Sequence, residues 1–472
     1  MENLAYNRWR SHATRGMVIS GEHRKQKIVG KIIMNTPGSL RWHFLYSTMA
    51  AVIGLAVALS WSTSSWAMHR EQHIFSIVDF GAVPNDEQLD TESVQKAIDK
   101  AAEVQGTVRI PAGRFILGNV QLRSGIRLVF EEGAVIQGSS DWRHYGQGRW
   151  TDSLFLGEDI TNLRIEGPGT IDGADCERPG GEEGFRGPHG IRLVRSSGVV
   201  INDVTIKRAG NYAIICWECR DVQVKGVTFR GGHDGVHAQA CQNFVIEACD
   251  FRTGDDCIAG CDNEHFVIRN CQINSSCNGF RLGCVHLLVE NCRFWGPGEY
   301  PHRITVRQGK PRTNMLSAFV HFAPTDRNPK LPSDDWLVRN CTMTNVDRVY
   351  SYDFEKGVWQ TGQPAKRLVF ENIQAEGIAF PLNILGDKDR QFDLTLRNVA
   401  ISLRPASAQQ PVIQARQFGK ITLERVVLKN DGSQPVLRAR EGNELILQNV
   451  AYPPECSQPF LLEDIVRIDR RP

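Results

Sequence analysis

The sequence predicts an all-β fold: a single-stranded right-handed parallel β-helix, with one helix capping its N-terminal end. Three observations predict this solenoid. A short phrase of alternating aliphatic residues recurs from about Leu163 onward, its starts are separated by nearly constant intervals, and no helical periodicity lies between the phrases. Repetition of both phrase and period is the signature of coils that stack on one another.

The repeat is most regular in the middle of the chain. Successive phrases begin at Val199, Val222, Phe244 and Phe266, at intervals of 23, 22 and 22 residues, and Leu287 follows after 21. A β-propeller is the alternative, but its blades need about 40 to 50 residues each. The intervals therefore favour a β-helix, whose parallel connections are right-handed.

The segment 73–145 differs from the repeats and predicts a cap with the first coils of one β-helix domain, 73–472. Residues 89–106 have the pattern of a helix that Asp90 or Thr91 caps and that Gly106 ends. Its apolar face would consist of Val94, Ala97, Ile98, Ala101 and Ala102. A helix placed here would cover the open apolar end of the solenoid.

Later in the chain, the period breaks between Phe294 and Trp336. Residues 295–335 are therefore predicted to be an inserted loop that projects from the edge of the coil. Long loops of this kind often shape binding sites.

Residues 1–67 predict a signal peptide with an extended basic region. They hold 8 Lys and Arg against 2 Asp and Glu, and residues 44–61 are apolar or small. The small residues around Ser65 and Ala67 fit a cleavage site. An uncleaved anchor is the alternative, since the apolar run approaches a spanning length. We expect a secreted or periplasmic protein.

The remaining chain has 47 basic and 51 acidic side chains, a net charge of about −4. This balance argues against a nucleic-acid partner, which needs a basic surface. No second stretch is apolar enough to span a membrane. We expect a monomer that has no membrane contact after signal cleavage.

Seven of the 13 cysteines form two periodic series. One series is Cys249, Cys271 and Cys292, and the other is Cys219, Cys241, Cys261 and Cys284. In a coil, such series form inward ladders of small buried side chains, and this interpretation outweighs metal binding. A lone CxxC at 216–219 is a weak signal. Export would permit disulfides, but the odd count leaves at least one thiol unpaired.

Three carboxylates in the stretch 231–261 are candidates for catalysis: Asp234 and, 21 residues after it, the pair Asp255–Asp256. Residues one coil apart lie on adjacent rungs, roughly 4.8 Å from each other. Carboxylates that close repel, so one of them tends to keep a proton. Because adjacent strand residues face opposite sides, we expect the chain to bend at Gly254–Asp255. The alternative is that these aspartates only bond their own turns.

Four motifs in this order resemble glycoside hydrolase family 28, the polygalacturonase-type pectin hydrolases of the pectate-lyase-like superfamily. They are DFGA at 79–82, PAGRF at 111–115, GAVI at 133–136 and TGDDCIA at 253–259. The resemblance runs from about Phe75 to Gly283. The Asn-Thr-Asp segment of the family matches only at Asp234, and its Gly-His-Gly segment aligns with Cys277-Asn278-Gly279. Its Arg-Ile-Lys segment has no clear counterpart.

The resemblance implies an exported glycosidase that cleaves a pectin-like, galacturonate-containing polysaccharide or oligosaccharide. Asp255 would be the general acid, and Asp234 and Asp256 would activate a water for an inverting displacement. Such an acid and base lie about 6.5 to 9.5 Å apart. This chemistry needs neither a metal nor an organic cofactor.

Candidate substrate-binding residues are His237, Asn278, Arg281, His302 and Arg303. His237 would lie near Asp234, and Arg281 follows the Asp pair by about one coil. His302 and Arg303 belong to a basic cluster that is either a solvated face or an acidic-sugar subsite. Two other functions remain open. One is a polysaccharide lyase or epimerase, which commonly needs Ca²⁺ or a basic residue, and the other is a carbohydrate-binding β-helix without catalysis.

Overall fold

The computed structural model describes residues 73–471, except 147, 149–150, 323, 325–329, 354–364, 387 and 390. The predicted signal peptide, 1–67, lies outside the described residues. No helix in the described part is both long enough and apolar enough to cross a membrane.

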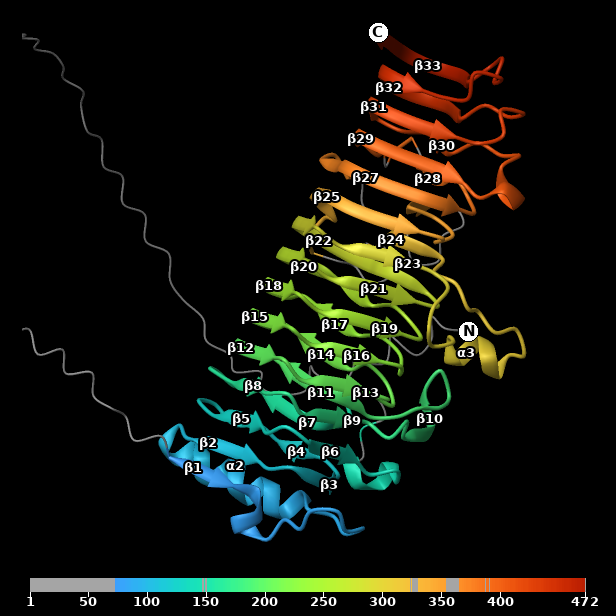
Figure 1. Ribbon diagram of the computed structural model, residues 1–472. Coiled ribbons are helices and arrows are strands. Elements are labelled where there is room, and N and C mark those ends of the chain that lie inside the picture. The colour runs from blue at the N-terminus through green and yellow to red at the C-terminus, as the bar shows by residue number, and fades with distance from the viewer. Residues whose placement is uncertain are drawn as a thin grey trace, which may run out of the picture. The chain divides into compact units, whose positions relative to one another are not determined.

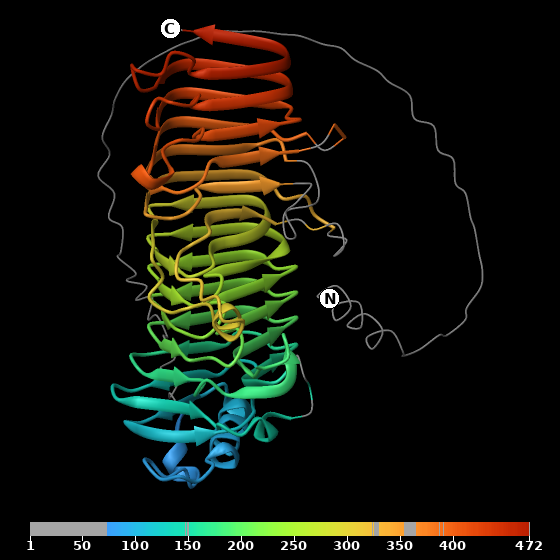
Figure 2. The ribbon, with the colours of Figure 1, turned by 90° about the vertical axis from the view of Figure 1, so that its right-hand side faces the viewer.

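The described chain is the predicted β-helix, in which each coil places its strands beside those of the next coil (Figures 1 and 2). The ladders between successive coils are parallel and define three sheets. The first sheet runs through β1 (Ile74–Ser76), β2 (Thr107–Ile110), β5 (Arg127–Phe130), β8 (Arg164–Glu166), β12 (Ser197–Asn202), β15 (Arg220–Lys225) and β18 (Gln242–Glu247). The second runs through β3 (Gly113–Leu117), β6 (Ala134–Gly138), β9 (Thr170–Asp172), β13 (Thr205–Lys207), β16 (Thr228–Arg230), β19 (Asp250–Thr253), β21 (Gln272–Ser275) and β23 (Arg293–Trp295).

The third sheet, called the site sheet below, carries the candidate site. Its own strands are β4 (Val120–Gln121), β7 (Ser153–Glu158), β11 (His189–Val194), β14 (Ile214–Trp217), β17 (Val236–Gln239), β24 (Ser317–His321), β26 (Tyr350–Asp353), β28 (Leu382–Leu385) and β30 (Ile413–Arg416). Longer strands turn a corner and serve two sheets: β20 (Ile258–Arg269), β22 (Asn278–Glu290), β25 (Asp334–Thr344), β27 (Leu368–Ile378), β29 (Leu394–Leu403), β32 (Leu437–Ala451) and β33 (Phe460–Arg471). Strand β31 (Lys420–Lys429) continues the first sheet, and β10 (Glu177–Glu182) lies beside the coil.

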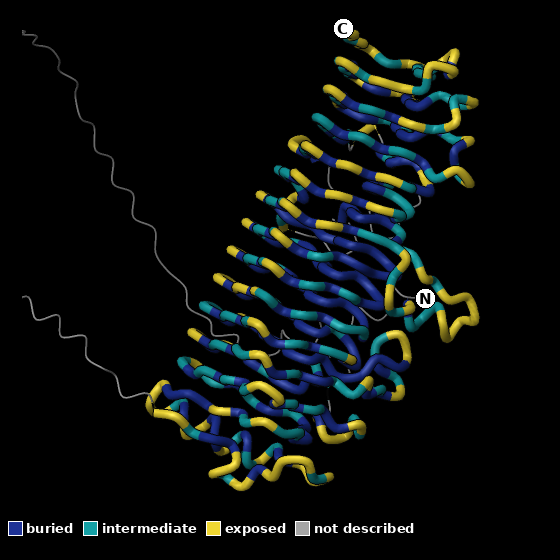
Figure 3. The backbone as a smooth tube through the Cα atoms, viewed as in Figure 1, coloured by how far each residue is buried: buried dark blue, intermediate teal, exposed yellow. Residues whose placement is uncertain are grey.

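The apolar phrases fill the interior of the coil (Figure 3). In β18, Phe244 and Ile246 are fully buried, whereas Val245 between them points outward and is partly exposed. Phe229 and Phe251 stack across neighbouring rungs with centroids 4.4 Å apart. The alternating pattern therefore fixed which face of each strand became core.

Helix α2 (Thr91–Val104) confirms the predicted cap and packs on β1 and β2. Asp90 holds the N-cap position, but its side chain accepts from the Val83 N–H instead of capping the helix. The left-handed C-terminal residue is Gln105, so the prediction that Gly106 supplies this turn was wrong. Gly106 is needed for another reason, since a Cβ there would lie 2.7 Å from the His73 carbonyl oxygen.

The insert also differs from the prediction. Within 295–335, strand β24 pairs in register with β22 and β26, so this part is regular coil and does not project. The projecting part includes the short helix α3 (Arg303–Arg307) (Figures 1 and 2). The repeat interval is interrupted between Phe294 and Trp336 because irregular segments flank strand β24.

All 13 cysteines are buried. The series Cys249, Cys271 and Cys292 stacks as predicted and continues into Cys341. The second series was wrong at Cys261, because a register shift after Gly260 places Asn263 between the rungs of Cys241 and Cys284. There the Asn263 carboxamide oxygen accepts from the Cys241 N–H.

Candidate active site

The three aspartates come together in turns that lead into the site sheet. Asp234 lies between β16 and β17, and Asp255 and Asp256 lie between β19 and β20. All three are buried, and one carboxylate oxygen of each lies within 4.8 Å of the others. The predicted clustering of these carboxylates is therefore confirmed.

The register differs from the predicted one by a single residue. Val236 pairs with Ile258, which places Asp234 opposite Asp256, 22 residues on, and not opposite Asp255. On the next rung, Asn278 lies opposite Asp256. We call such a line of equivalent positions on successive rungs a column. Asp255 instead shares a column with His233 and Cys277.

The predicted bend at Gly254–Asp255 is present, because β19 ends at Thr253 and β20 begins at Ile258. Gly254 is not in the left-handed region, so conformational freedom is not the reason for glycine here. A Cβ on Gly254 would lie 2.7 Å from the Pro301 carbonyl oxygen and 2.8 Å from that of Gly232. The turn therefore requires a residue without a side chain at position 254, because the backbones of Pro301 and Gly232 both approach it closely.

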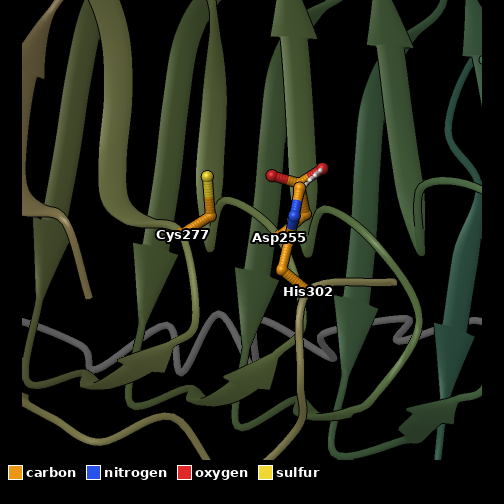
Figure 4. A group of neighbouring side chains, drawn as sticks. All are labelled: Asp255, Cys277 and His302. Atoms are coloured by element: carbon orange, nitrogen blue, oxygen red, sulfur yellow. Dashed lines mark ion pairs between the residues drawn. The ribbon is translucent and has the colours of Figure 1, made fainter. Parts of the chain in front are cut away.

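Two nitrogen-bearing side chains face Asp255. The Arg186 guanidinium donates to Asp255 Oδ2 at 2.7 Å, and His302 Nε2 lies 3.5 Å from the same oxygen. Figure 4 shows His302 against Asp255, with Cys277 beside them. Burial alone raises the pKa of the Asp255 carboxyl, but the contact with His302 and the charge of Arg186 outweigh it and hold the pKa well below its usual range.

Asp234 has the opposite electrostatic setting. Burial and the negative charges of Asp255 and Asp256 raise its pKa well above the usual range. Its Oδ2 lies 3.1 Å from His237 Nδ1 and 3.8 Å from Arg281 Nη2. The surroundings of the cluster therefore favour the protonated form of Asp234 and the ionised form of Asp255.

Asp256 is held from the following rung. The Asn278 amide donates to Asp256 Oδ1 at 2.8 Å, and Arg281 Nε donates to Oδ2. We predicted that Asn278, His237 and Arg281 bind substrate. In the structure each of them contacts one of the aspartates. Their described contacts hold the carboxylates in place.

Sequence reasoning missed Arg186, which lies between β10 and β11. Its side chain is buried and also contacts Glu183 and Asn211. The regular repeat intervals of the sequence begin only at Val199. No sequence signal therefore placed Arg186 beside Asp255, which lies 69 residues later.

Of the two insert residues predicted to bind substrate, His302 contacts Asp255 and Arg303 does not. Arg303 Nη2 donates to Glu177 at 2.8 Å and its guanidinium lies over the Phe185 ring. Arg303 thus ties the insert to β10, which holds His302 over the aspartates.

An open hollow of about 160 Å³ adjoins the cluster on the C-terminal side. Its lining includes Asn278, Val320, Arg348 and Phe380, and also Asp347, which forms an ion pair with Arg404. The Phe380 ring is 45% exposed and lies under the Arg348 guanidinium at 5.3 Å. An exposed ring beside a cation suits a sugar that carries a carboxylate.

Two sets of side chains in the site could hold a metal by donor type and proximity: the three aspartates, and Asp255 with Cys277 and His302. Both sets already face arginines, since Arg186 and Arg281 bind the carboxylates and Arg312 Nη1 lies 3.1 Å from Cys277 Sγ. A cation would have to displace these guanidinium groups. The donors therefore fit a metal poorly, and we assign none to the site.

Comparison with known proteins agrees with this geometry. The sequence profile described as glycosyl hydrolases family 28 matches residues 101–285. A "Probable polygalacturonase" of Vitis vinifera is 29% identical over 180 residues, which cover 33% of this chain and 36% of the relative. The chain thus spans only about a third of the length of this curated relative.

Solved structures extend the likeness along the coil. The family 28 exopolygalacturonase of Yersinia enterocolitica superposes with a TM-score of 0.56 at 17% identity, covering 84% of this chain and 78% of that one. A hyperthermoactive exopolygalacturonase of Thermotoga maritima gives a TM-score of 0.48 at 15% identity, covering 84% and 92%. The first of these shows a shared right-handed β-helix fold. Residues 101–285 are thus similar to glycosyl hydrolase family 28, within a chain that has the right-handed parallel β-helix fold.

Proposed function

We propose that this protein hydrolyses glycosidic bonds in a galacturonate-containing polysaccharide or oligosaccharide. The observation that carries the proposal is the buried cluster of three carboxylates, in which the pKa of Asp234 is raised by burial and by its two neighbours. Glycoside hydrolysis needs an acid for the leaving oxygen and a base for the attacking water. The hollow beside Asn278, with Arg348 and Phe380, supports an acidic sugar as the substrate.

The proposed mechanism starts with the proton on Asp234 and moves it to Asp255. A substrate carboxylate that draws Arg186 or His302 away from Asp255 would raise the pKa of Asp255 and favour this transfer. Asp255 then protonates the leaving oxygen as the C–O bond breaks. Asp234 and Asp256 hold a water, and one of them takes its proton as the hydroxyl bonds to the anomeric carbon.

The stereochemical outcome needs its own test. The carboxylate oxygens lie within 4.8 Å of one another, which is closer than the range of about 6.5 to 9.5 Å expected of an inverting pair. We propose inversion, as the family resemblance implies, with the water held at the edge of the cluster. Proton NMR of the first sugar released would show the inverted anomer, and the retained anomer would overturn this proposal.

The test of activity is release of reducing ends by the full chain from polygalacturonate, methyl-esterified pectin and a neutral galactan. We expect release from the acidic polymer, no effect of a chelator, and a loss of at least about 100-fold in Asp255→Asn. Asp221→Asn is the matched control, because Asp221 is an exposed carboxylate of β15 in the first sheet, away from the site. Equal activity of Asp255→Asn and wild type would contradict the proposed role.

The same assay separates the alternatives. Calcium-dependent formation of an unsaturated product would indicate a lyase. Binding of polymer without cleavage, unchanged in Asp255→Asn, would leave a carbohydrate-binding β-helix.

We also propose that the protein is exported to the periplasm or medium, since a polymeric substrate is not available in the cytosol. The support is the predicted signal peptide at 1–67. N-terminal sequencing of the mature protein would show a start near Met68 if cleavage occurs. A start near residue 1 in the mature protein would contradict it.

A further inference from the structure

A further group of metal-ligating side chains lies at the corner where β20, β22 and β25 turn from the site sheet into the first sheet (Figure 1). The ladder pairing of these strands puts His265, His286 and Asp335 on successive rungs, so they form one column. Glu264 precedes His265 in β20. The corner follows the site-sheet part of β20, whereas Asp256 precedes that part. The group is therefore separate from the candidate active site.

Three side chains of this group bring their donor atoms together. One donor atom of each of Glu264, His265 and His286 lies within 4.8 Å of the others. The two imidazole rings stack with their centroids 4.6 Å apart. The His265 side chain is 50% exposed and that of His286 is 42% exposed, so an ion in solution can reach both. Ligand atoms about 2.0 Å from a tetrahedral metal lie roughly 3.3 Å from one another, and exposed side chains rotate readily enough to reach that spacing.

Asp335 orients one of the two imidazoles. His286 Nδ1 lies 2.6 Å from Asp335 Oδ2, and an ionised carboxylate only accepts, so the ring donates through Nδ1. In the neutral ring this leaves the lone pair on Nε2, where a metal binds. Metal-binding histidines almost always donate their other ring N–H to such a partner. The Glu264 carboxylate is also held, because Gln242 Nε2 donates to its Oε2 at 2.9 Å.

The charges and donor types at the corner suit a transition-metal cation. Glu264 and Asp335 bring two carboxylates, and Arg367 Nε lies 3.7 Å from Asp335 Oδ1. The same guanidinium also contacts Asp334 at 3.3 Å, so its charge is shared between two carboxylates. Two imidazoles and a carboxylate are typical ligands of Zn²⁺, whereas Ca²⁺ and Mg²⁺ prefer oxygen ligands alone.

We propose that Glu264, His265 and His286 bind a zinc ion that clamps β20 to β22, with a water as the fourth ligand. The register between these strands shifts after Gly260, and β25 follows the irregular segments that flank β24. The ion would thus join rungs where the repeat is least regular. An ion that binds only the folded corner stabilises the folded chain. The proposal is independent of the proposed function, because none of its ligands belongs to the candidate active site.

The test is a calorimetric titration of the full chain with zinc chloride, after removal of any affinity tag and treatment with a chelator. We expect a zinc-binding event that is abolished in His265→Asn/His286→Asn. Asparagine is a mild replacement, since Asn243 holds the same column one rung earlier. The φ angle of Asn243 is 56°, against 56° for His265 and 59° for His286, so the left-handed backbone of the corner accepts it.

Two further variants separate a built site from histidine content. Asp335→Asn should bind zinc roughly tenfold more weakly than wild type, because the partner that orients His286 is lost. His73→Asn/His144→Asn is the matched control, since it removes two exposed histidines from other parts of the coil. This control should bind zinc as wild type does. Calcium chloride should give no binding that depends on His265 and His286.

Stability provides the second measurement. Zinc should raise the melting temperature of wild type and of the control, and leave that of His265→Asn/His286→Asn unchanged. Equal zinc binding by wild type and this double variant, or no binding by wild type, overturns the proposal. Binding without a rise in the melting temperature overturns the clamp. The double variant should release reducing ends from polygalacturonate as wild type does, so failure of the clamp and failure of the proposed function give different results.

Discussion

Asp234, Asp255 and Asp256 carry the same side chain, and their neighbours give them different states. Asp255 faces Arg186 and His302, while Asp234 lies among carboxylates in a buried position. The same physical causes, burial and nearby charge, thus push two pKa values in opposite directions. Such a difference is what allows one carboxyl to keep the proton that another will use.

Replacing Asp234 should reveal its raised pKa as a stability effect. A carboxyl whose folded pKa is raised binds its proton more tightly in the folded state, so its contribution to stability falls as pH rises above the unfolded value of about 3.9. Asp234→Asn should therefore raise the melting temperature at pH 8 more than at pH 5, and lower activity at least about 100-fold. An equal change at both pH values would contradict the raised pKa.

Replacing Arg186 should have the opposite pH dependence. The lowered pKa of Asp255 contributes stability above the unfolded pKa, and this is lost as pH falls through the folded value, below 3.8. Arg186→Gln should cost about 3–5 kcal/mol at pH 7, because it leaves a buried carboxylate unpaired, and less below pH 4. Urea unfolding at both pH values measures this.

Arg195→Gln is the control for Arg186→Gln. It breaks an exposed pair with Asp159, which should contribute only about 0–1 kcal/mol. A cost for Arg186→Gln no larger than that of Arg195→Gln would show that the buried pair does not hold the site.

At the scale of elements, the site depends on turns that bring separate segments together. The turn before β20 presents Asp255 and Asp256 and also accommodates the insert, whose Pro301 carbonyl lies against Gly254. Helix α3 and β10 are joined through Arg303 and Glu177. These contacts hold His302 over the aspartates.

Gly254→Ala tests this arrangement. The added Cβ would meet two backbone oxygens at 2.7 and 2.8 Å, and the crowding should cost about 1–3 kcal/mol and displace His302. We expect lower stability in thermal unfolding and reduced activity on polygalacturonate. Val306→Ala, at an exposed position of α3 in the same insert, should keep activity. Full activity in Gly254→Ala would contradict a positioning role for this contact.

The sequence was enough to predict the coil, the cap and the gathering of the aspartates, since periodicity and the motif at 253–259 carry that information. It could not predict the one-residue register difference between Asp234 and Asp256, because an interval of 21 or 22 residues is within the variation of the repeat. Nor could the sequence predict the register shift after Gly260 that moves Cys261 out of its predicted series, because that shift is also within the variation of the repeat. Arg186 was not predictable, because its contact depends on where β10 leaves the coil.

At the scale of the whole described coil, stability comes from stacking of similar layers. Each rung contacts its neighbours, and the interior rows run from one coil to the next, as Phe229 and Phe251 do. In such a solenoid, stability approximates a sum over rungs and the interfaces between them. Loss of one interior ring therefore weakens two interfaces.

Phe251→Ala should cost about 3–5 kcal/mol, because it leaves a cavity in the interior row. The measurement is the urea midpoint and the slope of the transition. If the coil unfolds as one unit, the slope should equal that of wild type, whereas a smaller slope would show that the coil divides at this rung. Val245→Ala, at a partly exposed outward position of β18, should cost less than about 1 kcal/mol.

The column that holds Asp234, Asp256 and Asn278 makes distances in this site discrete. Backbone ladders fix the interval between equivalent positions at roughly 4.8 Å, so a pair can be one step apart or two, with little between. In an enzyme whose cleft is formed by loops, changes in the loops can alter the distance between two catalytic groups continuously. Loop changes do not alter the distance between positions of one column here. An acidic residue at position 278 would lie two steps from Asp234, roughly 10 Å away. Any alteration of the spacing of the acid and the base in this fold is therefore a choice among whole steps of the coil.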